Sequence, residues 1–292
     1  MNNIVLMGTG SWGSAIKSLL EENKQAVSIW ENGQKLSSGS VVINAIPTQA
    51  IREVLTPSRH TSDITYINCA KGIERETHKL PFQIVSEILG EGLDYFSLIG
   101  PSFSEEVVNK MPTIVNLGFR NEEKAEMIRN LFQTEYFRVK KTKGIRSLEL
   151  AAAFKNIYAI ACGVAEGLGY KMNTRVKLMC LAIDEFNNLR LKLDYKIDEK
   201  AIPATVGDLI LTCSSEESRN FTFGENLAKY SVEKSLELSK GTVEGYYTVE
   251  TVSYFEKETG VKLPLAHFVY SLTHEKNQTN IKKLFTDFVK ST

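Results

Sequence analysis

A glycine-rich turn near the start of the chain constrains its fold more than any other segment. Residues 4–7 form a short apolar run that is typical of a strand, Gly-Thr-Gly-Ser-Trp-Gly follows at 8–13, and helical periodicity continues from Ser14. A strand, a G-x-G-x-x-G turn and a helix in this order predict the phosphate-binding turn of a dinucleotide-binding fold. The glycine pattern alone is weak evidence, and a glycine turn without a ligand is the alternative.

The three glycines of this turn have different physical roles. Gly8 permits the tight turn, Gly10 leaves the backbone open to the pyrophosphate, and Gly13 lets the helix lie close to the strand. The helix N-terminus then offers free N–H groups and a positive dipole end to the phosphates.

Length and charge limit the class of protein. The 292 residues suggest two domains, and 35 basic against 35 acidic side chains provide no field for nucleic acid. The first strand leaves no room for a signal peptide, and we expect no apolar run that approaches the ~18 residues of a membrane span. These features predict a soluble cytoplasmic protein.

The cysteines and histidines suggest no metal site. Four cysteines lack C-x-x-C spacing and lie in apolar stretches, so we expect buried thiols in a reducing compartment (Cys69, Cys162, Cys180 and Cys213). The four histidines lack ligand spacing.

The first half of the chain alternates strand and helix patterns. Strands are predicted at 3–7, 26–30, 41–46, 64–69, 95–99 and 112–117, and helices at 13–22, 48–55, 79–90, 102–109 and 122–132. This alternation predicts an α/β Rossmann-like domain over 1–142 with a mostly parallel sheet.

From residue 143 the pattern becomes helical. Helices are predicted at 147–167, 173–193, 205–213, 220–230, 244–259, 264–273 and 280–290. We therefore expect an all-α domain over 143–292.

The connection after the second strand is unusually short. About ten residues separate Trp30 from Val41, whereas a parallel crossover with a helix needs roughly a dozen or more. We expect the sheet to be trimmed here, with the strand at 41–46 on the far side of the first strand and no strand outside 26–30.

Glu31 follows the second strand, 18 residues after Gly13. An acid at this place accepts hydrogen bonds from the adenosine ribose and favours NAD over NADP. A solvated loop glutamate is the alternative.

Two later strands end in polar residues that would face the ligand crevice. Lys71 follows the strand at 64–69 and could hold a substrate phosphate or the cofactor, with a surface lysine as the alternative. Ser102 follows the strand at 95–99, and Glu105 stands three residues later, so Ser102 could also be a helix N-cap with a capping box.

A lysine interrupts the most apolar helix. Lys155 and Asn156 lie within the predicted helix at 147–167, and a buried lysine needs a partner or a lowered pKa. Asp208, on the predicted helix at 205–213 with Thr212 one turn later, is the natural partner. A lysine that reaches solvent is the alternative.

Ser218, Arg219 and Asn220 precede another helix. Hydroxyl, guanidinium and amide donors at a helix start can hold a phosphate, whereas a simple helix cap is the alternative.

Taken together, these segments resemble the NAD(P)-dependent glycerol-3-phosphate dehydrogenase family. The resemblance rests on GTGSWG, AKGIE, GPSF-x-E-E, ELAAAFKNIYAIACG, NTR, GDLILTC, SRN and VEGYYT, in this order from Ile4 to about Val252. KNIYAIACG, GDLILTC and SRN are much more specific than the glycine turn.

The resemblance implies reduction of dihydroxyacetone phosphate to sn-glycerol 3-phosphate with NAD(H) or NADP(H). It implies that Lys155 is the proton donor and that Asp208 orients it. The substrate-binding residues implied are Lys71, Gly100, Ser102, Asn156, Thr212, Ser218, Arg219 and Asn220. The cofactor-binding residues are Gly8, Gly10, Ser11, Trp12, Gly13, Glu31, Lys71, Ser104, Arg219 and Glu244. A role in supplying glycerol phosphate for phospholipids follows, and a homodimer is left open.

Several positions depart from the family pattern. The segment after the second strand is short, Glu31-Asn32 stands where many members have a basic residue, and Ser104 replaces a common alanine. Residues 204–206 are an unusual lead into Gly207-Asp208. The expected catalytic pair is intact, so we expect NADH to be accepted, with weaker cofactor binding than the glycine turn alone implies.

Two other functions stay open on the sequence. One is a related two-domain dehydrogenase for a 3-hydroxy acid, ketopantoate or an opine, although Lys71 and Ser218-Arg219-Asn220 favour a phosphate over a carboxylate. The other is a non-catalytic nucleotide-binding protein, against which Lys155 and Asp208 argue.

Overall fold

The computed structural model describes residues 3–275 and 280–292 and divides into two compact units. The first comprises Met1–Glu149 and Lys196–Thr205, and the second comprises Leu150–Tyr195 and Val206–Thr292. The expected boundary at 142/143 thus falls seven residues early, and 196–205 belongs with the first unit. Asp198 explains this return, because it accepts hydrogen bonds from the Thr142 hydroxyl at 2.5 Å and the Lys143 N–H at 2.9 Å.

The first unit is built on a seven-stranded sheet of order β2-β1-β3-β4-β5-β6-β7. All neighbouring strands are parallel except the antiparallel pair β5 and β6. The strands are β1 (Ile4–Met7), β2 (Val27–Ile29), β3 (Val41–Asn44), β4 (Thr65–Asn68), β5 (Asp94–Ile99), β6 (Thr113–Phe119) and β7 (Phe137–Thr142).

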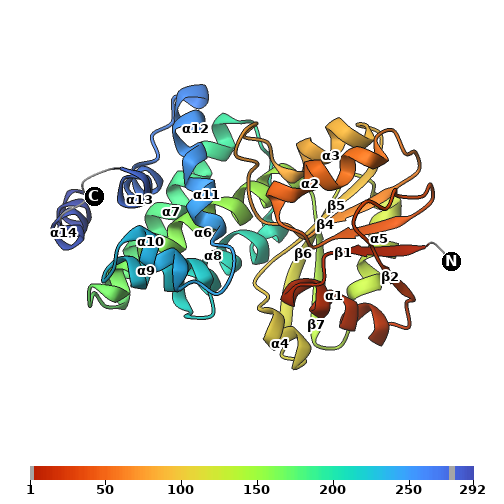
Figure 1. Cartoon of the computed structure of the whole chain (residues 1–292), viewed down its shortest axis with the longest axis horizontal. Coiled ribbons are helices and arrows are strands. Elements are labelled where there is room, and N and C mark those ends of the chain that lie inside the picture. Colours follow the sequence, from red (N-terminus) through yellow and green to blue (C-terminus); the bar gives the residue numbers. More distant parts are fainter. Residues whose placement is uncertain (1–2, 276–279) are drawn as a thin grey trace. The chain divides into compact units, whose positions relative to one another are not determined.

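Helices cover both faces of the sheet, with α2 and α3 on one face and α1 on the other (Figure 1). An apolar core fills the space between the sheet and the helices on each face. Residues of α1 and α5 pack on one face, and residues of α2 and α3 pack on the other. The helices are α1 (Ser11–Glu22), α2 (Thr48–Leu55), α3 (Pro81–Leu89), α4 (Ser104–Val108) and α5 (Glu122–Phe132), with 3₁₀ turns at Thr56–Ser58 and Glu199–Ala201. The predicted α/β class and the mostly parallel sheet are confirmed.

The trimmed edge of the sheet is also confirmed. Among the described residues β2 pairs only with β1, and β3 pairs with the other side of β1. The connection between them contains no helix; it buries Leu36, whose N–H donates to the Ser58 hydroxyl at 2.8 Å. That anchor lets a bare loop replace the usual crossover.

The edge strand β7 was not predicted. Phe137 and Val139 are buried and alternate with the exposed Arg138 and Lys140, which is the pattern of a strand with one solvated face. Charged side chains are common on edge strands.

The second unit is helical. Its helices are α7 (Met172–Lys192), α8 (Asp208–Ser214), α9 (Arg219–Leu227), α10 (Val232–Glu237), α11 (Glu244–Thr248), α12 (Val252–Thr259), α13 (Pro264–His274) and α14 (Ile281–Ser291), and α6 (Ile145–Gly167) enters it from the first unit. The prediction missed α10. The helix expected at 244–259 is interrupted by the 3₁₀ turn Val249–Thr251, and a π-helical turn at Pro203–Gly207 precedes α8.

Helix α6 is the central element of this unit. By length and composition it could span a membrane, which differs from the expectation of no such run, but the whole of its apolar window is buried. Its backbone lies against α9, because a Cβ on Gly163 would meet the Phe221 carbonyl oxygen at 1.9 Å and one on Gly224 would meet that of Ile160 at 2.1 Å. The burial of α6 is that of a core helix.

One cysteine differs from its prediction. Cys69, Cys162 and Cys213 are buried free thiols, but Cys180 is exposed on α7. Only one side of α7 is buried. Cys180 comes directly after the buried Leu178 and Met179 and lies on the solvent-facing side of the helix.

Candidate functional site

The glycine turn has the backbone that its predicted roles require. Gly8 has a φ of +98°, and a Cβ there would meet the Ala45 carbonyl at 2.9 Å. A Cβ on Gly13 would meet the Gly8 oxygen at 2.0 Å, so only glycine lets α1 lie this close to β1. Space above Gly10 is open, which leaves the N-terminus of α1 accessible. The turn therefore fits a dinucleotide pyrophosphate.

Ser11, Trp12 and Glu31 lie on the same edge of the sheet as this turn. Ser11 is exposed in the first turn of α1, and Trp12 is partly buried against the core. Leu6 pairs with Ile29, so Gly8 and the exposed Glu31 each stand two residues beyond a paired position. The ribose-binding role of Glu31 stays a prediction.

Lys71, Gly100 and Ser102 lie together beyond β4 and β5. Lys71 donates from Nζ to the Gly100 carbonyl at 3.0 Å, and the Ser102 hydroxyl donates to the same oxygen at 3.2 Å. The capping alternative for Ser102 is wrong, because α4 begins at Ser104 with Phe103 as its N-cap. Ser104 is thus the first helical residue, and its cofactor role stays a prediction.

In the second unit, α6 and α8 bring Lys155, Asp208 and Thr212 together. The Lys155 ammonium donates to Asp208 Oδ1 at 2.7 Å and to Thr212 Oγ1 at 2.6 Å. The Thr212 hydroxyl donates to the Asp208 carbonyl at 2.6 Å, so its lone pairs remain for Lys155. Lys155 is 7% exposed and Asp208 1%. The alternative in which Lys155 simply reaches solvent does not hold.

Asn156 belongs to a separate amide cluster on the same helix. The Asn220 amide donates to Asn156 Oδ1 at 3.1 Å and accepts the Gly245 N–H at 2.8 Å. A Cβ on Gly245 would meet the Asn156 carbonyl at 2.4 Å. Only glycine therefore lets α11 lie this close to α6 at Asn156, and the sequence analysis did not single out Gly245, although its place in VEGYYT was a signal.

Ser218, Arg219 and Glu244 lie at helix starts. Ser218 caps α9 and accepts the Phe221 N–H at 3.3 Å, so the capping alternative holds for it, and its substrate role stays a prediction. Arg219 is exposed, and its guanidinium packs over Gly241. Burial raises the pKa of Glu244 to about 7, although the positive charge of Arg219 opposes this shift.

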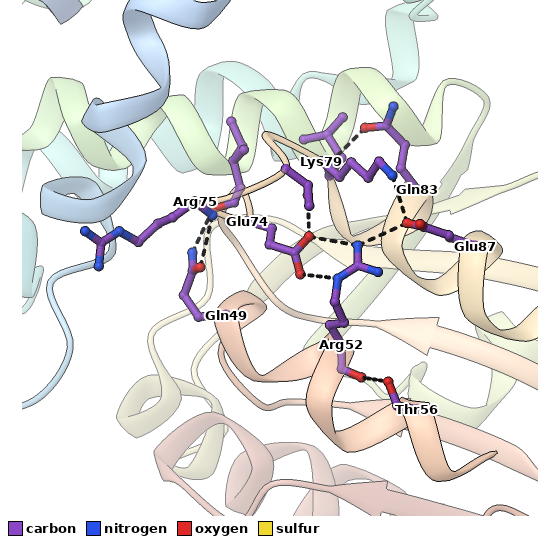
Figure 2. Close-up of polar contacts among 11 residues, drawn as sticks. Gln49, Arg52, Thr56, Glu74, Arg75, Lys79, Gln83 and Glu87 are labelled. Atoms are coloured by element: carbon purple, nitrogen blue, oxygen red, sulfur yellow. Dashed lines mark hydrogen bonds and ion pairs between the residues drawn. The ribbon is translucent and has the colours of Figure 1, made fainter. Parts of the chain in front are cut away.

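The sequence analysis missed the support of the segment that carries Lys71. Arg52 and Gln49 of α2 bind this segment through Glu74 and its backbone (Figure 2). Glu74 within AKGIE was the available signal. Over residues 3–275 and 280–292 no group of histidine, cysteine and acidic side chains could hold a metal ion.

A glycine turn at the carboxyl edge of a parallel sheet and a buried lysine–aspartate pair in a helical unit define a class of protein. It is the class of two-unit nicotinamide-dependent dehydrogenases. Models of the NAD-dependent glycerol-3-phosphate dehydrogenase N-terminus and C-terminus match residues 33–125 and 144–283. The chain belongs to the NAD-dependent glycerol-3-phosphate dehydrogenase family.

Individual relatives agree with this membership. The chain is 34% identical to glycerol-3-phosphate dehydrogenase [NAD(P)+] of Geobacillus thermodenitrificans, covering 93% of this chain and 90% of the relative. It is 32% identical to the Staphylococcus epidermidis enzyme of that name, with 94% of each covered. The structure of glycerol-3-phosphate dehydrogenase from Coxiella burnetii has the same fold, with a TM-score of 0.87 at 22% identity over 99% and 98% of the two chains.

Proposed function

We propose that this protein interconverts dihydroxyacetone phosphate and sn-glycerol 3-phosphate with NAD(H) or NADP(H). The observation that carries the proposal is the buried Lys155–Asp208–Thr212 cluster. It lies in a chain whose relatives are named for this activity.

The nicotinamide cofactor, held at its pyrophosphate by the 8–13 turn, would supply the hydride. Lys155 is the proton donor: as an ammonium it gives one proton to the oxygen that becomes the new hydroxyl and is left as an amine. In the reverse direction the amine takes that proton back. Asp208 at 2.7 Å stabilises the ammonium and fixes Nζ, and Thr212 restricts it further.

The phosphate of the substrate needs cationic and amide donors. In the first unit we assign this role to Lys71, supported by Gly100 and Ser102. In the second unit the family resemblance assigns substrate contacts to Asn156, Thr212, Ser218, Arg219 and Asn220. A guanidinium and an ammonium favour a phosphate dianion over a neutral alcohol group.

The cofactor contacts beyond the turn are assigned by family resemblance. They are Ser11, Trp12, Glu31, Lys71, Ser104, Arg219 and Glu244. An acid at Glu31 repels a 2′-phosphate, so we assign a preference for NADH over NADPH. The exposed position of Glu31 supports this assignment.

The cellular role follows from the reaction. We propose a cytoplasmic enzyme that supplies glycerol phosphate for phospholipid synthesis, with a homodimer as its candidate assembly.

An absorbance assay tests the function directly. Purified protein should oxidise NADH at 340 nm only when dihydroxyacetone phosphate is added, and inorganic phosphate should compete with that substrate. Failure with this substrate and turnover of ketopantoate or a 3-hydroxy acid would identify the related dehydrogenase class. Cofactor binding without any turnover would identify a non-catalytic protein. Faster turnover with NADPH than with NADH would refute the role given to Glu31.

A further inference from the structure

The segment that carries Lys71 has no regular secondary structure, yet side chains hold it on either side of Lys71. Residues 69–80 connect β4 to α3. At the first end the buried Asn68 amide binds both the N–H and the carbonyl of Ala70, at 3.0 and 3.1 Å. Lys71 follows directly and donates to the Gly100 carbonyl.

The backbone after Lys71 is held by an ion pair. Glu74, three residues after Lys71, receives two parallel hydrogen bonds from Arg52, Nε to Oε1 and Nη2 to Oε2, each 2.9 Å long (Figure 2). The Thr77 hydroxyl donates to the same carboxylate. The Glu74 side chain is 8% exposed and that of Arg52 is 30% exposed, so the fork-shaped contact is buried on its carboxylate side and reaches the surface on its guanidinium side.

Gln49, one helical turn before Arg52 on α2, binds the backbone of the residues next to Glu74. Its amide donates to the Ile73 carbonyl at 2.7 Å and accepts the Arg75 N–H at 3.1 Å. Ile73 is fully buried. Two side chains of one helix face therefore fix the backbone on either side of Glu74.

The network continues onto α3. Arg52 also donates to Glu87 at 3.0 Å, and Lys79 donates to the same Glu87 oxygen at 2.8 Å (Figure 2). Arg52 thus connects α2, the 69–80 segment and α3 through one rigid guanidinium.

We infer that the Arg52–Glu74 pair, together with Gln49, is a positioning device for Lys71. It holds the short backbone link of Gly72 and Ile73, and this keeps the lysine ammonium where a phosphate can bind it. The inference rests on the proposed function for the identity of that phosphate. Misplacement of a binding group by about 1 Å can cost as much as 100-fold in rate.

Both Arg52 and Glu74 are ionised at neutral pH, which keeps the ion pair in place. Burial opposes ionisation of Glu74, but the hydrogen bonds from Arg52 and Thr77 outweigh it and hold the pKa below its usual value. Arg52 stays charged, since these carboxylates raise its pKa. The Arg52–Glu74 ion pair is therefore formed throughout the neutral pH range.

A purely stabilising ion pair between α2 and α3 is the competing explanation. Arg52→Met removes the ion pair with Glu74, and Arg52→Lys keeps the charge but loses the paired hydrogen bonds. Lys124→Met is the matched control, because Lys124 pairs with Asp94 in the same unit and has no contact with the 69–80 segment among its observed bonds. Each variant is first checked for folding by circular dichroism.

Kinetics separate the two explanations. Arg52→Met should lower kcat/KM for dihydroxyacetone phosphate about ten-fold, with Arg52→Lys in between and Lys124→Met unchanged. In a Lys71→Met background the same Arg52 substitution should have almost no further effect, because the group it positions is gone. An equal effect in both backgrounds would overturn the inference while leaving the proposed function intact.

Hydrogen exchange provides a test that does not depend on activity. In Arg52→Met the peptide covering 69–80 should exchange at least about ten-fold faster, since the Glu74, Arg75 and His78 N–H bonds lose their support. The Lys124→Met protein should exchange as the wild type does. Unchanged exchange in Arg52→Met overturns the inference even if the wild type proves inactive on dihydroxyacetone phosphate, which would refute the proposed function separately.

Discussion

Lys155 and Asp208 carry opposite charges where almost no water reaches them, and each is costly to bury without the other. Lys155→Met should lower kcat about 10³-fold, the range of a lost general acid. Because that variant leaves Asp208 unpaired, the double variant Lys155→Met/Asp208→Asn should fold better and stay inactive. Lys229→Met, at an exposed lysine of the same unit, is the control. Full reductase activity in Lys155→Met would refute the assigned mechanism.

Glu244 offers a pH-dependent test at the same scale. Burial sets its pKa at about 7, so its carboxylate forms as the pH rises through 7. If that carboxylate binds the cofactor, kcat/KM for NADH rises over this range, and Glu244→Gln removes the rise. Glu258→Gln, at an exposed glutamate of the same unit, should keep it. The same pH profile in Glu244→Gln and the wild type would exclude this role.

At the scale of elements, two glycines of the turn between β1 and α1 have different roles, Gly13 in packing and Gly10 in cofactor binding. Gly13→Ala forces a Cβ onto the Gly8 carbonyl and should destabilise the protein by about 1–3 kcal/mol, the usual cost of overpacking. Gly10→Ala places its methyl in open space, so it should keep the melting temperature and raise the KM for NADH. Equal losses of stability in the two variants would contradict this division. Thermal unfolding and cofactor titration provide both measurements.

The start of α6 is another element held by a single side chain. Glu149 is buried and accepts hydrogen bonds from Tyr95 at 2.5 Å, Ser97 at 2.7 Å, the Phe82 N–H at 2.9 Å and Asn68 at 3.2 Å. Glu149→Ala leaves these donors unsatisfied, and we expect a loss of about 3–5 kcal/mol in urea unfolding. A loss below 1 kcal/mol, on the order of an exposed pair, would show that water replaces the carboxylate.

For the whole molecule, a buried glutamate predicts how stability depends on pH. Glu185 caps α13 through the Leu265 and Ala266 N–H groups, and burial raises its pKa to about 7. Because the folded-state value lies above the unfolded one, this contribution is full below pH ~4.5 and is lost as the pH rises through 7. As the pH rises from about 4.5 to 7, the free energy of unfolding of Glu185→Gln should therefore increase by about 3 kcal/mol relative to that of the wild type. Parallel stability curves for the two proteins would disprove this assignment.

How much of the fold the sequence predicts depends on the range of the interactions. The alternation of strands and helices, the glycine turn and the helical second half were predicted because hydrophobic period and turn chemistry are local. The sequence missed β7, α10 and the break in 244–259. These elements depend on contacts with partner strands and neighbouring helices, and a charged edge strand has no distinctive local signal.

The sequence by itself determined the family, the glycine turn that fits a dinucleotide and the residue types of the proposed catalytic pair. Only the tertiary structure decided which alternatives hold: Lys155 is buried against Asp208, Ser102 is not a cap, and Ser218 is one. It also revealed Arg52 and Gln49 beneath the Lys71 segment. Motifs record which groups are present, but hydrogen-bond partners 20 or more residues apart, such as Arg52 and Glu74, exist only after the chain has packed.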